Sequence, residues 1–99
     1  MKVQIQSIHF SADAKLIQFV EEKVDKLGLF YQEIIGSEVF LRLDKNSNTE
    51  NKIAEIKLHI PGNDLFVKKQ CKSFEEATDT AVDALTRQLK KHKEKVKGL

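Results

Sequence analysis

Hydrophobic and polar residues alternate in four segments of this 99-residue chain, the pattern of β-strands with one buried face. These segments are residues 2–9, 38–43, 54–60 and 65–71. Pro61-Gly62-Asn63-Asp64 separates the last two segments and predicts the turn of a hairpin. A polar loop at 46–51 separates the two middle strands.

Two other segments carry apolar residues at helical spacing. The apolar positions of the first are Leu16, Ile17, Val20, Val24 and Leu27. Ser11 or Asp13 is expected to cap the start of this helix, and Gly28 is expected to end it. The connection after it is expected to pack against the core through Leu29, Phe30, Ile34 and Ile35.

The second helix is predicted to run from a capping box, formed by Ser73 and Glu76, to about residue 96. The element order is then β-α-β-β-β-α. Consecutive antiparallel strands with both helices on one face predict a two-layer α+β sandwich with a four-stranded sheet. One proline and four glycines leave no flexible linker, so residues 1–99 are expected to form a single domain.

Composition indicates where such a domain works. The single cysteine, Cys71, excludes an internal disulfide and fits a reducing compartment. The N-terminus lacks the apolar run of a signal peptide, and no segment approaches the roughly 18 apolar residues of a membrane span. We therefore expect a cytoplasmic protein without a membrane partner.

Positive charge is concentrated at one end of the chain. Residues 87–97 carry +5, from six Lys/Arg and one Glu, whereas the whole chain carries +2. Residues 1–86 hold 11 basic and 14 acidic residues and so carry −3. On a helical wheel the cations lie outside an apolar stripe that extends from Phe74 to Val96 and includes His92. The basic residues are therefore expected to form the surface of a helix that is anchored to the core.

Composition alone allows three explanations of this basic helix. It is a nucleic-acid site, a solvated helix end whose cations favour the macrodipole, or a site for anionic lipid or acidic protein. Lipid is disfavoured because a membrane-binding helix needs a free apolar face. The first helix adds Lys15, Lys23 and Lys26 along one edge, and the sequence does not fix whether that edge faces the basic end of the last helix.

The last helix also contains a specific motif. Residues 79–95 end in an RQLxKHKxK pattern after an Ala/Asp/Leu-rich stretch. Val20-Glu-Glu-Lys23 with Leu27, and the hairpin at 54–66, add to the match. In these motifs, and over its whole length, the chain resembles the short form of the ribosome hibernation-promoting factors, also called ribosome-associated translation inhibitors or sigma-54 modulation proteins.

The resemblance implies a fold similar to a double-stranded-RNA-binding domain, with no catalytic activity, cofactor, metal or small-molecule substrate. It implies binding to ribosomal RNA phosphates of the small ribosomal subunit, in the channel used by messenger and transfer RNA. Translation would be inhibited and idle ribosomes protected, as a stress response in stationary phase. The RNA-binding residues that it implies are Lys23, Lys26, Arg87, Lys90, Lys91, Lys93, Lys95 and Lys97. Long members of the family have a C-terminal dimerisation domain that is absent here, so a monomer is expected off the ribosome.

The chain departs from the family pattern at two places. Glu75 stands where the family usually has a tyrosine, and the fourth strand, often acidic in the family, here carries Lys68 and Lys69, with Lys72 directly after it. Two alternative functions are a general structured-RNA-binding module and a protein-interaction regulator of sigma-54-dependent transcription.

No other chemistry is predicted. His9, His59, His92 and Cys71 lack the spacing of zinc ligands. The sequence also lacks a glycine-rich phosphate loop and a nucleophile motif.

Overall fold

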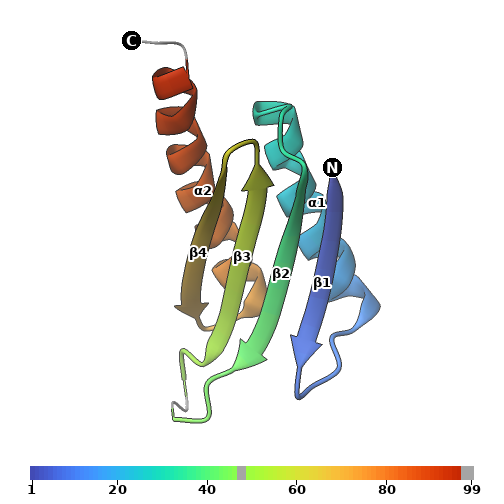
Figure 1. Cartoon of the computed structure of the whole chain (residues 1–99). Coiled ribbons are helices and arrows are strands. Elements are labelled where there is room, and N and C mark those ends of the chain that lie inside the picture. The colour runs from blue at the N-terminus through green and yellow to red at the C-terminus, as the bar shows by residue number, and fades with distance from the viewer. Residues whose placement is uncertain (47–48, 97–99) are drawn as a thin grey trace.

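The computed structural model describes residues 1–46 and 49–96. Its elements are β1 (Lys2–Ile8), α1 (Ala14–Phe30), β2 (Gly36–Leu43), β3 (Lys52–Ile60), β4 (Asn63–Cys71) and α2 (Phe74–Val96). The four strands form one sheet, and both helices cover the same face of it (Figure 1). The predicted two-layer α+β architecture is confirmed.

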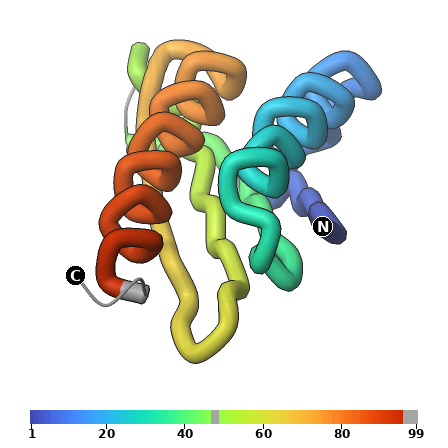
Figure 2. The backbone as a smooth tube through the Cα atoms, turned by 90° about the horizontal axis from the view of Figure 1, so that it is seen from above, coloured from blue at the N-terminus to red at the C-terminus, as the bar shows by residue number. Residues whose placement is uncertain are grey.

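The sheet is mixed, with the strand order β1-β2-β3-β4. The expected antiparallel pairing is found between β2 and β3 and between β3 and β4, whereas β1 and β2 are parallel. Parallel pairing arises because α1 carries the chain back along the sheet before β2 begins. The two helices lie side by side and run in the same direction (Figures 1 and 2).

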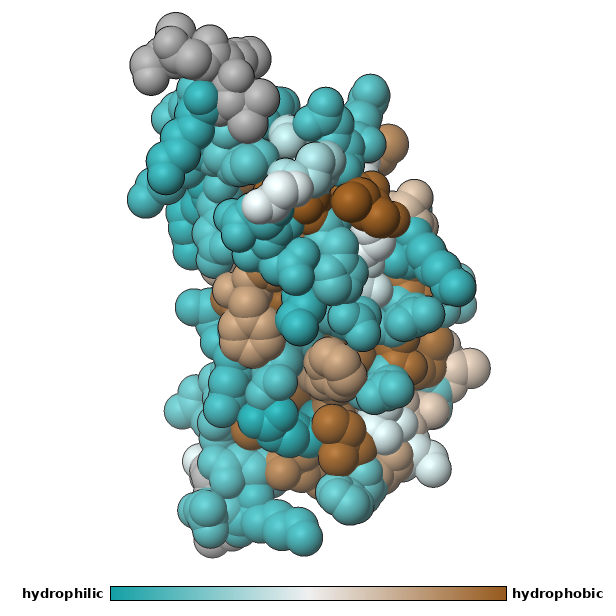
Figure 3. All heavy atoms as spheres, viewed as in Figure 1, coloured by the Kyte–Doolittle hydropathy of each residue, from teal (hydrophilic) through white to brown (hydrophobic). Residues whose placement is uncertain are grey.

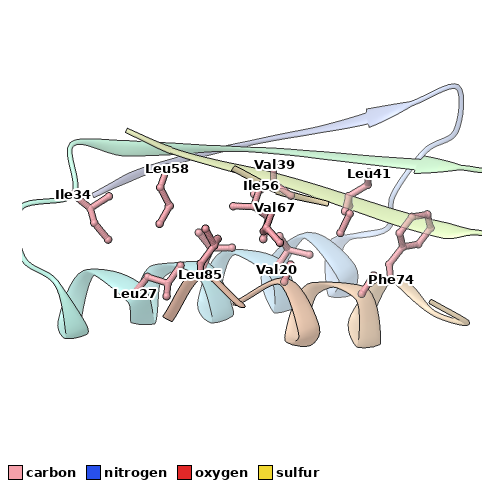
Figure 4. Close-up of a cluster of buried hydrophobic side chains, with 14 of the residues drawn as sticks. Val20, Leu27, Ile34, Val39, Leu41, Ile56, Leu58, Val67, Phe74 and Leu85 are labelled. Atoms are coloured by element: carbon pink, nitrogen blue, oxygen red, sulfur yellow. The ribbon is translucent and has the colours of Figure 1, made fainter. Parts of the chain in front are cut away.

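The core lies between the sheet and the helices, as the period-2 and helical patterns predict. Figure 4 labels ten of its side chains: Val39 and Leu41 of β2, Ile56 and Leu58 of β3, Val67 of β4, Val20 and Leu27 of α1, Phe74 and Leu85 of α2, and Ile34. Burial of each such side chain stabilises the fold by about 1.5–3 kcal/mol. This packing holds α2 on the sheet through Leu85 and Leu89, both of which are 0% exposed.

Helix α1 begins where its sequence predicts but ends later. Asp13 is the N-cap, because its carboxylate accepts a 2.8 Å hydrogen bond from the backbone N–H of Leu16. The expectation that Gly28 ends the helix was wrong. The helix continues to Phe30, and the backbone N–H of Tyr31 donates to the Leu27 carbonyl at 2.9 Å.

The extra helical residues change which side chains reach the core. Ile34 is buried as expected, but Leu29 is 82% exposed and Ile35 is 66% exposed. Leu29 continues the helix on the side away from the sheet, so it cannot pack in the connection as predicted. Leu43, expected on the buried face of β2, is 41% exposed at the end of the strand.

The β3–β4 hairpin is tighter than the sequence suggests. Asn63 and Asp64 pair with β3 in the ladder, so only Pro61 and Gly62 form the turn. Gly62 has a φ of +79°, which a type II turn requires at its second central position. The predicted cap of α2 is confirmed, since the Glu76 N–H donates to Ser73 Oγ at 3.0 Å.

Candidate nucleic-acid interface

The C-terminal half of α2 presents cations outside its buried stripe. Leu85 and Leu89 pack in the core, and several of the side chains between and after them are exposed to solvent. Four of these are exposed cations: Arg87, Lys90, Lys91 and Lys95. We call these four residues the α2 cationic surface. Because α2 is fixed to the sheet, their charges are held on a rigid support.

Lys23 and Lys26 of α1 lie in different environments. The Lys23 ammonium lies 3.2 Å from a carboxylate oxygen of Asp79 on α2, and its side chain is 35% exposed. Lys26 is exposed. Helical spacing places Lys26 on the same edge of α1 as Lys23, one turn further along. At Lys23 this edge of α1 therefore faces the N-terminal part of α2 and not its basic end.

Lys93 is the second cation engaged between the helices. Its ammonium donates a 3.2 Å hydrogen bond to the backbone carbonyl of Phe30, the last residue of α1. The same ammonium lies 4.6 Å from the centre of the Phe30 ring, in a cation–π arrangement. Beside this contact, the rings of Tyr31 and His92 meet edge to face at 5.6 Å. We call these four residues, Phe30, Tyr31, His92 and Lys93, the helix-end clasp.

The basic surface continues around α2 toward the hairpin. Lys91, His92 and Lys95 line a shallow hollow of about 180 Å³ with Gln88, Asn63 and Leu65. Lys69 alternates in phase with the buried residues of β4, so it lies on the helix-bearing face, whereas Lys68 lies on the opposite face. Glu75 is exposed in the first turn of α2, away from the cationic end.

The open face of the sheet has a different character. Arg42 is paired with Glu55, and His59 bridges Glu38 and Asp64 at 2.9 and 3.1 Å. Hydrogen bonds from the ring N–H groups of His59, first to the Glu38 carboxylate and then to that of Asp64, raise the pKa of His59 above its ordinary value. Figure 3 shows that this face is largely hydrophilic, with separate apolar side chains. Because opposite charges alternate and pair there, the concentrated positive charge belongs to the helical face.

The described part of the chain offers little for other chemistry. Within it, no three His, Cys, Asp or Glu side chains are grouped so that they could hold a metal ion. Cys71 is buried, and this burial raises the pKa of its thiol. Neither helix among the described residues is long and apolar enough to cross a lipid bilayer.

Of the eight site residues predicted from the sequence, seven lie within the described residues. Lys26 and the α2 cationic surface are exposed, whereas Lys23 and Lys93 are half-buried in contacts between the helices. Lys97 lies outside the described residues. Phe30 was expected to pack in the core and instead partners Lys93. The sequence feature that points to this contact is the absence of a basic residue from the last turn of α1, which leaves that helix end open to a cation from elsewhere.

Comparison with known proteins assigns the family. The family described as "Sigma 54 modulation protein / S30EA ribosomal protein" matches residues 3–97. The chain belongs to this family. Members similar to it include the "Ribosome hibernation promoting factor" of Pseudomonas putida, which is 31% identical over 99 residues, covering 100% of this chain and 93% of the relative. The protein of the same name from Escherichia coli (strain K12) is 29% identical over 97 residues, covering 98% of each.

Solved structures of similar proteins share the fold. A "ribosomal subunit interface protein" from Coxiella burnetii superimposes with a TM-score of 0.84 at 19% identity, covering 95% of this chain and 99% of that one. The N-terminal domain of Thermus thermophilus Protein Y gives a TM-score of 0.79 at 24% identity, covering 93% and 99%. At these identities the likeness establishes the fold, and the family rests on the sequence match.

Proposed function

We propose that this protein is a ribosome hibernation factor that binds the small ribosomal subunit through its helical face and inhibits translation. The observation that carries the proposal is the α2 cationic surface, four exposed cations on a helix whose opposite side is fixed in the core. The names of its family relatives, ribosome hibernation promoting factors, support the ribosome as the partner.

Binding of this kind depends on phosphates. Each Lys or Arg that neutralises a ribosomal RNA phosphate releases a counterion, so affinity is expected to fall steeply with salt. Phosphate contacts orient a protein but read little sequence. Selectivity for the subunit would then come from the shape of the folded RNA and from the spacing of the cations on two helices.

Inhibition requires only that the domain occupy space. The protein is elongated, with principal extents of 46 × 23 × 18 Å. A body of this size placed in the channel of messenger and transfer RNA would exclude both ligands while contacting the channel wall through its basic face. No catalytic step is needed, and the protein would act as a monomer in the cytoplasm, without a cofactor.

The test compares two triple variants that each remove three positive charges. Arg87→Gln/Lys90→Gln/Lys91→Gln neutralises the helical face. Lys2→Gln/Lys45→Gln/Lys68→Gln neutralises exposed lysines elsewhere. Co-sedimentation with small subunits at two salt concentrations, together with in vitro translation, should show loss of binding and inhibition for the first variant only. Equal weakening by both would mean that net charge, and not this face, determines binding.

A general RNA-binding module is the nearest alternative, since phosphate contacts alone do not distinguish one RNA from another. Competition by bulk double-stranded RNA separates the two functions. Competition as effective as that of free subunits would favour the general module.

The family description also includes sigma-54 modulation, which favours a second class of function. In that case the principal partner would be a protein of the transcription machinery. Affinity capture before and after nuclease treatment decides between the two. Capture of a polymerase subunit that persists after nuclease treatment would support the transcriptional function. Capture of small-subunit proteins that is lost after nuclease treatment would support the ribosomal one.

A further inference from the structure

Lys93 differs from the other cations of α2 in what surrounds its charge. The α2 cationic surface is exposed, and within the described residues none of its four members forms an ion pair. Lys93 is half-buried, and its ammonium is directed at the end of α1. Its ammonium is therefore directed at the protein itself, through one of its three N–H donors.

The C-terminal end of α1 is stabilised by a nearby cation. The last carbonyls of a helix lack intrahelical partners and carry the negative end of the helix dipole. Helix α1 has no basic residue in its last turn, so that turn supplies no cation to balance this charge. Lys93 supplies the missing cation from the other helix, by a hydrogen bond to the Phe30 carbonyl and by its position over the Phe30 ring.

The clasp lies where α2 leaves the support of the sheet. Leu89 is the last fully buried residue of α2 among those whose side chains are described. Figure 1 shows that the final turns of α2 extend past the β3–β4 hairpin. On the hairpin side these turns border the hollow lined by Lys91 and Lys95, and among the described side chains the clasp joins them to the end of α1.

We infer that Lys93 is a positioning residue for RNA binding. It joins the end of α2 to the end of α1 and so fixes the distance between Lys26 on one helix and Lys90 on the other. The family resemblance implies that Lys93 binds phosphate directly, whereas its contacts indicate that it holds the phosphate-binding residues in place. The role in binding rests on the proposed function, but the clasp itself is a property of the free protein.

Hydrogen exchange on the free protein tests the clasp. Lys93→Gln removes the charge, and Phe30→Leu removes the ring while keeping an apolar side chain. Both should raise the exchange of amides 90–96 by about threefold or more, because local opening of this end becomes easier. Lys95→Gln, which removes an exposed cation of the same turn, should leave the exchange of these amides unchanged. Lys93→Arg, which keeps the charge, should retain the protection of the unaltered protein. Unchanged exchange in both Lys93→Gln and Phe30→Leu would overturn the inference.

The salt dependence of binding to small subunits then separates positioning from phosphate contact. A lost phosphate contact lowers the slope of log affinity against log salt by about 0.7–0.9. Lys90→Gln should show this change. Lys93→Gln and Phe30→Leu should each weaken binding by about two- to fivefold with little change in slope, and the double variant should lose no more than either one.

The two failures are distinguishable. A full slope change in Lys93→Gln, with normal binding by Phe30→Leu, would make Lys93 a phosphate ligand and overturn the positioning role. If the unaltered protein does not bind subunits, the proposed function fails, and the exchange experiment still decides whether the clasp holds the two helices together.

Discussion

The ammonium of Lys23 on α1 lies 3.2 Å from a carboxylate oxygen of Asp79 on α2, so a cation expected to bind RNA is already paired inside the protein. Both side chains are partly exposed, at 35% and 52%. A pair so exposed stabilises the fold by about 1 kcal/mol at most. Its larger effect is on the helical face, where Asp79 places a negative charge beside the predicted phosphate ligands.

Asp79→Asn should therefore strengthen RNA binding while barely changing stability. Freeing Lys23 and removing one negative charge is expected to raise affinity for small subunits by about two- to fivefold at low salt. Binding assays at low and high salt measure the effect. Glu50→Gln, which removes an exposed acid in the loop before β3 and away from the helices, is the control. An equal gain from Glu50→Gln would show that net charge alone is responsible.

His59 makes part of the stability depend on pH. Its hydrogen bonds to Glu38 and Asp64 favour the protonated ring and raise its pKa above the ordinary value of 6.5. The stabilisation of the fold by the protonated His59 ring is thus fully present below 6.5 and is lost as pH rises through the pKa of the folded state. The unfolding temperature of the wild type should exceed that of His59→Gln most at acidic pH. A difference that grows toward alkaline pH would contradict this assignment, and an NMR titration of the ring gives the pKa directly.

Truncation of a buried side chain at the end of the apolar stripe of α2 should destabilise the fold. Leu89→Ala is expected to lower the free energy of unfolding by about 2–5 kcal/mol, because Leu89 is 0% exposed and truncation of its side chain leaves a cavity. Urea denaturation measures this loss. Leu29→Ala on α1, where the side chain is 82% exposed, should change stability by less than about 0.5 kcal/mol. A large loss from Leu29→Ala would mean that the connection packs as the sequence first suggested.

The start of α1 gives a test of capping between two neighbouring candidates. Asp13→Ala should cost about 1 kcal/mol, since the Leu16 N–H then loses its acceptor. Ser11→Ala should be nearly neutral, because the described hydrogen bonds give Ser11 no part in the cap. Chemical denaturation of the two variants distinguishes them, and the reverse order of effects would reassign the cap.

Much of the fold follows from local patterns in the sequence. Alternation in the strands and the 3.6-residue period of the helices are read directly from residue order, and all six elements appear where these patterns predict. The Ser73 cap likewise depends on a residue three positions away. The end of α1 was harder to place, since Gly28 is tolerated inside a helix that continues to Phe30. Likewise, the parallel pairing of β1 with β2 depends on the path of a connection and not on the strands themselves.

The order of residues was enough to identify the cations on a helix surface, because charge and helical period are local properties. It did not determine which of them are free to meet a phosphate. Lys23, Lys90 and Lys93 look alike in the sequence, yet Lys23 meets Asp79 and Lys93 meets the end of α1, while Lys90 faces solvent. These partners are far away in the chain, and only the packing of α2 beside α1 brings them within contact distance. Which lysines have a partner within the protein therefore depends on the tertiary structure, since an electrostatic interaction depends on distance in space and not on distance along the chain.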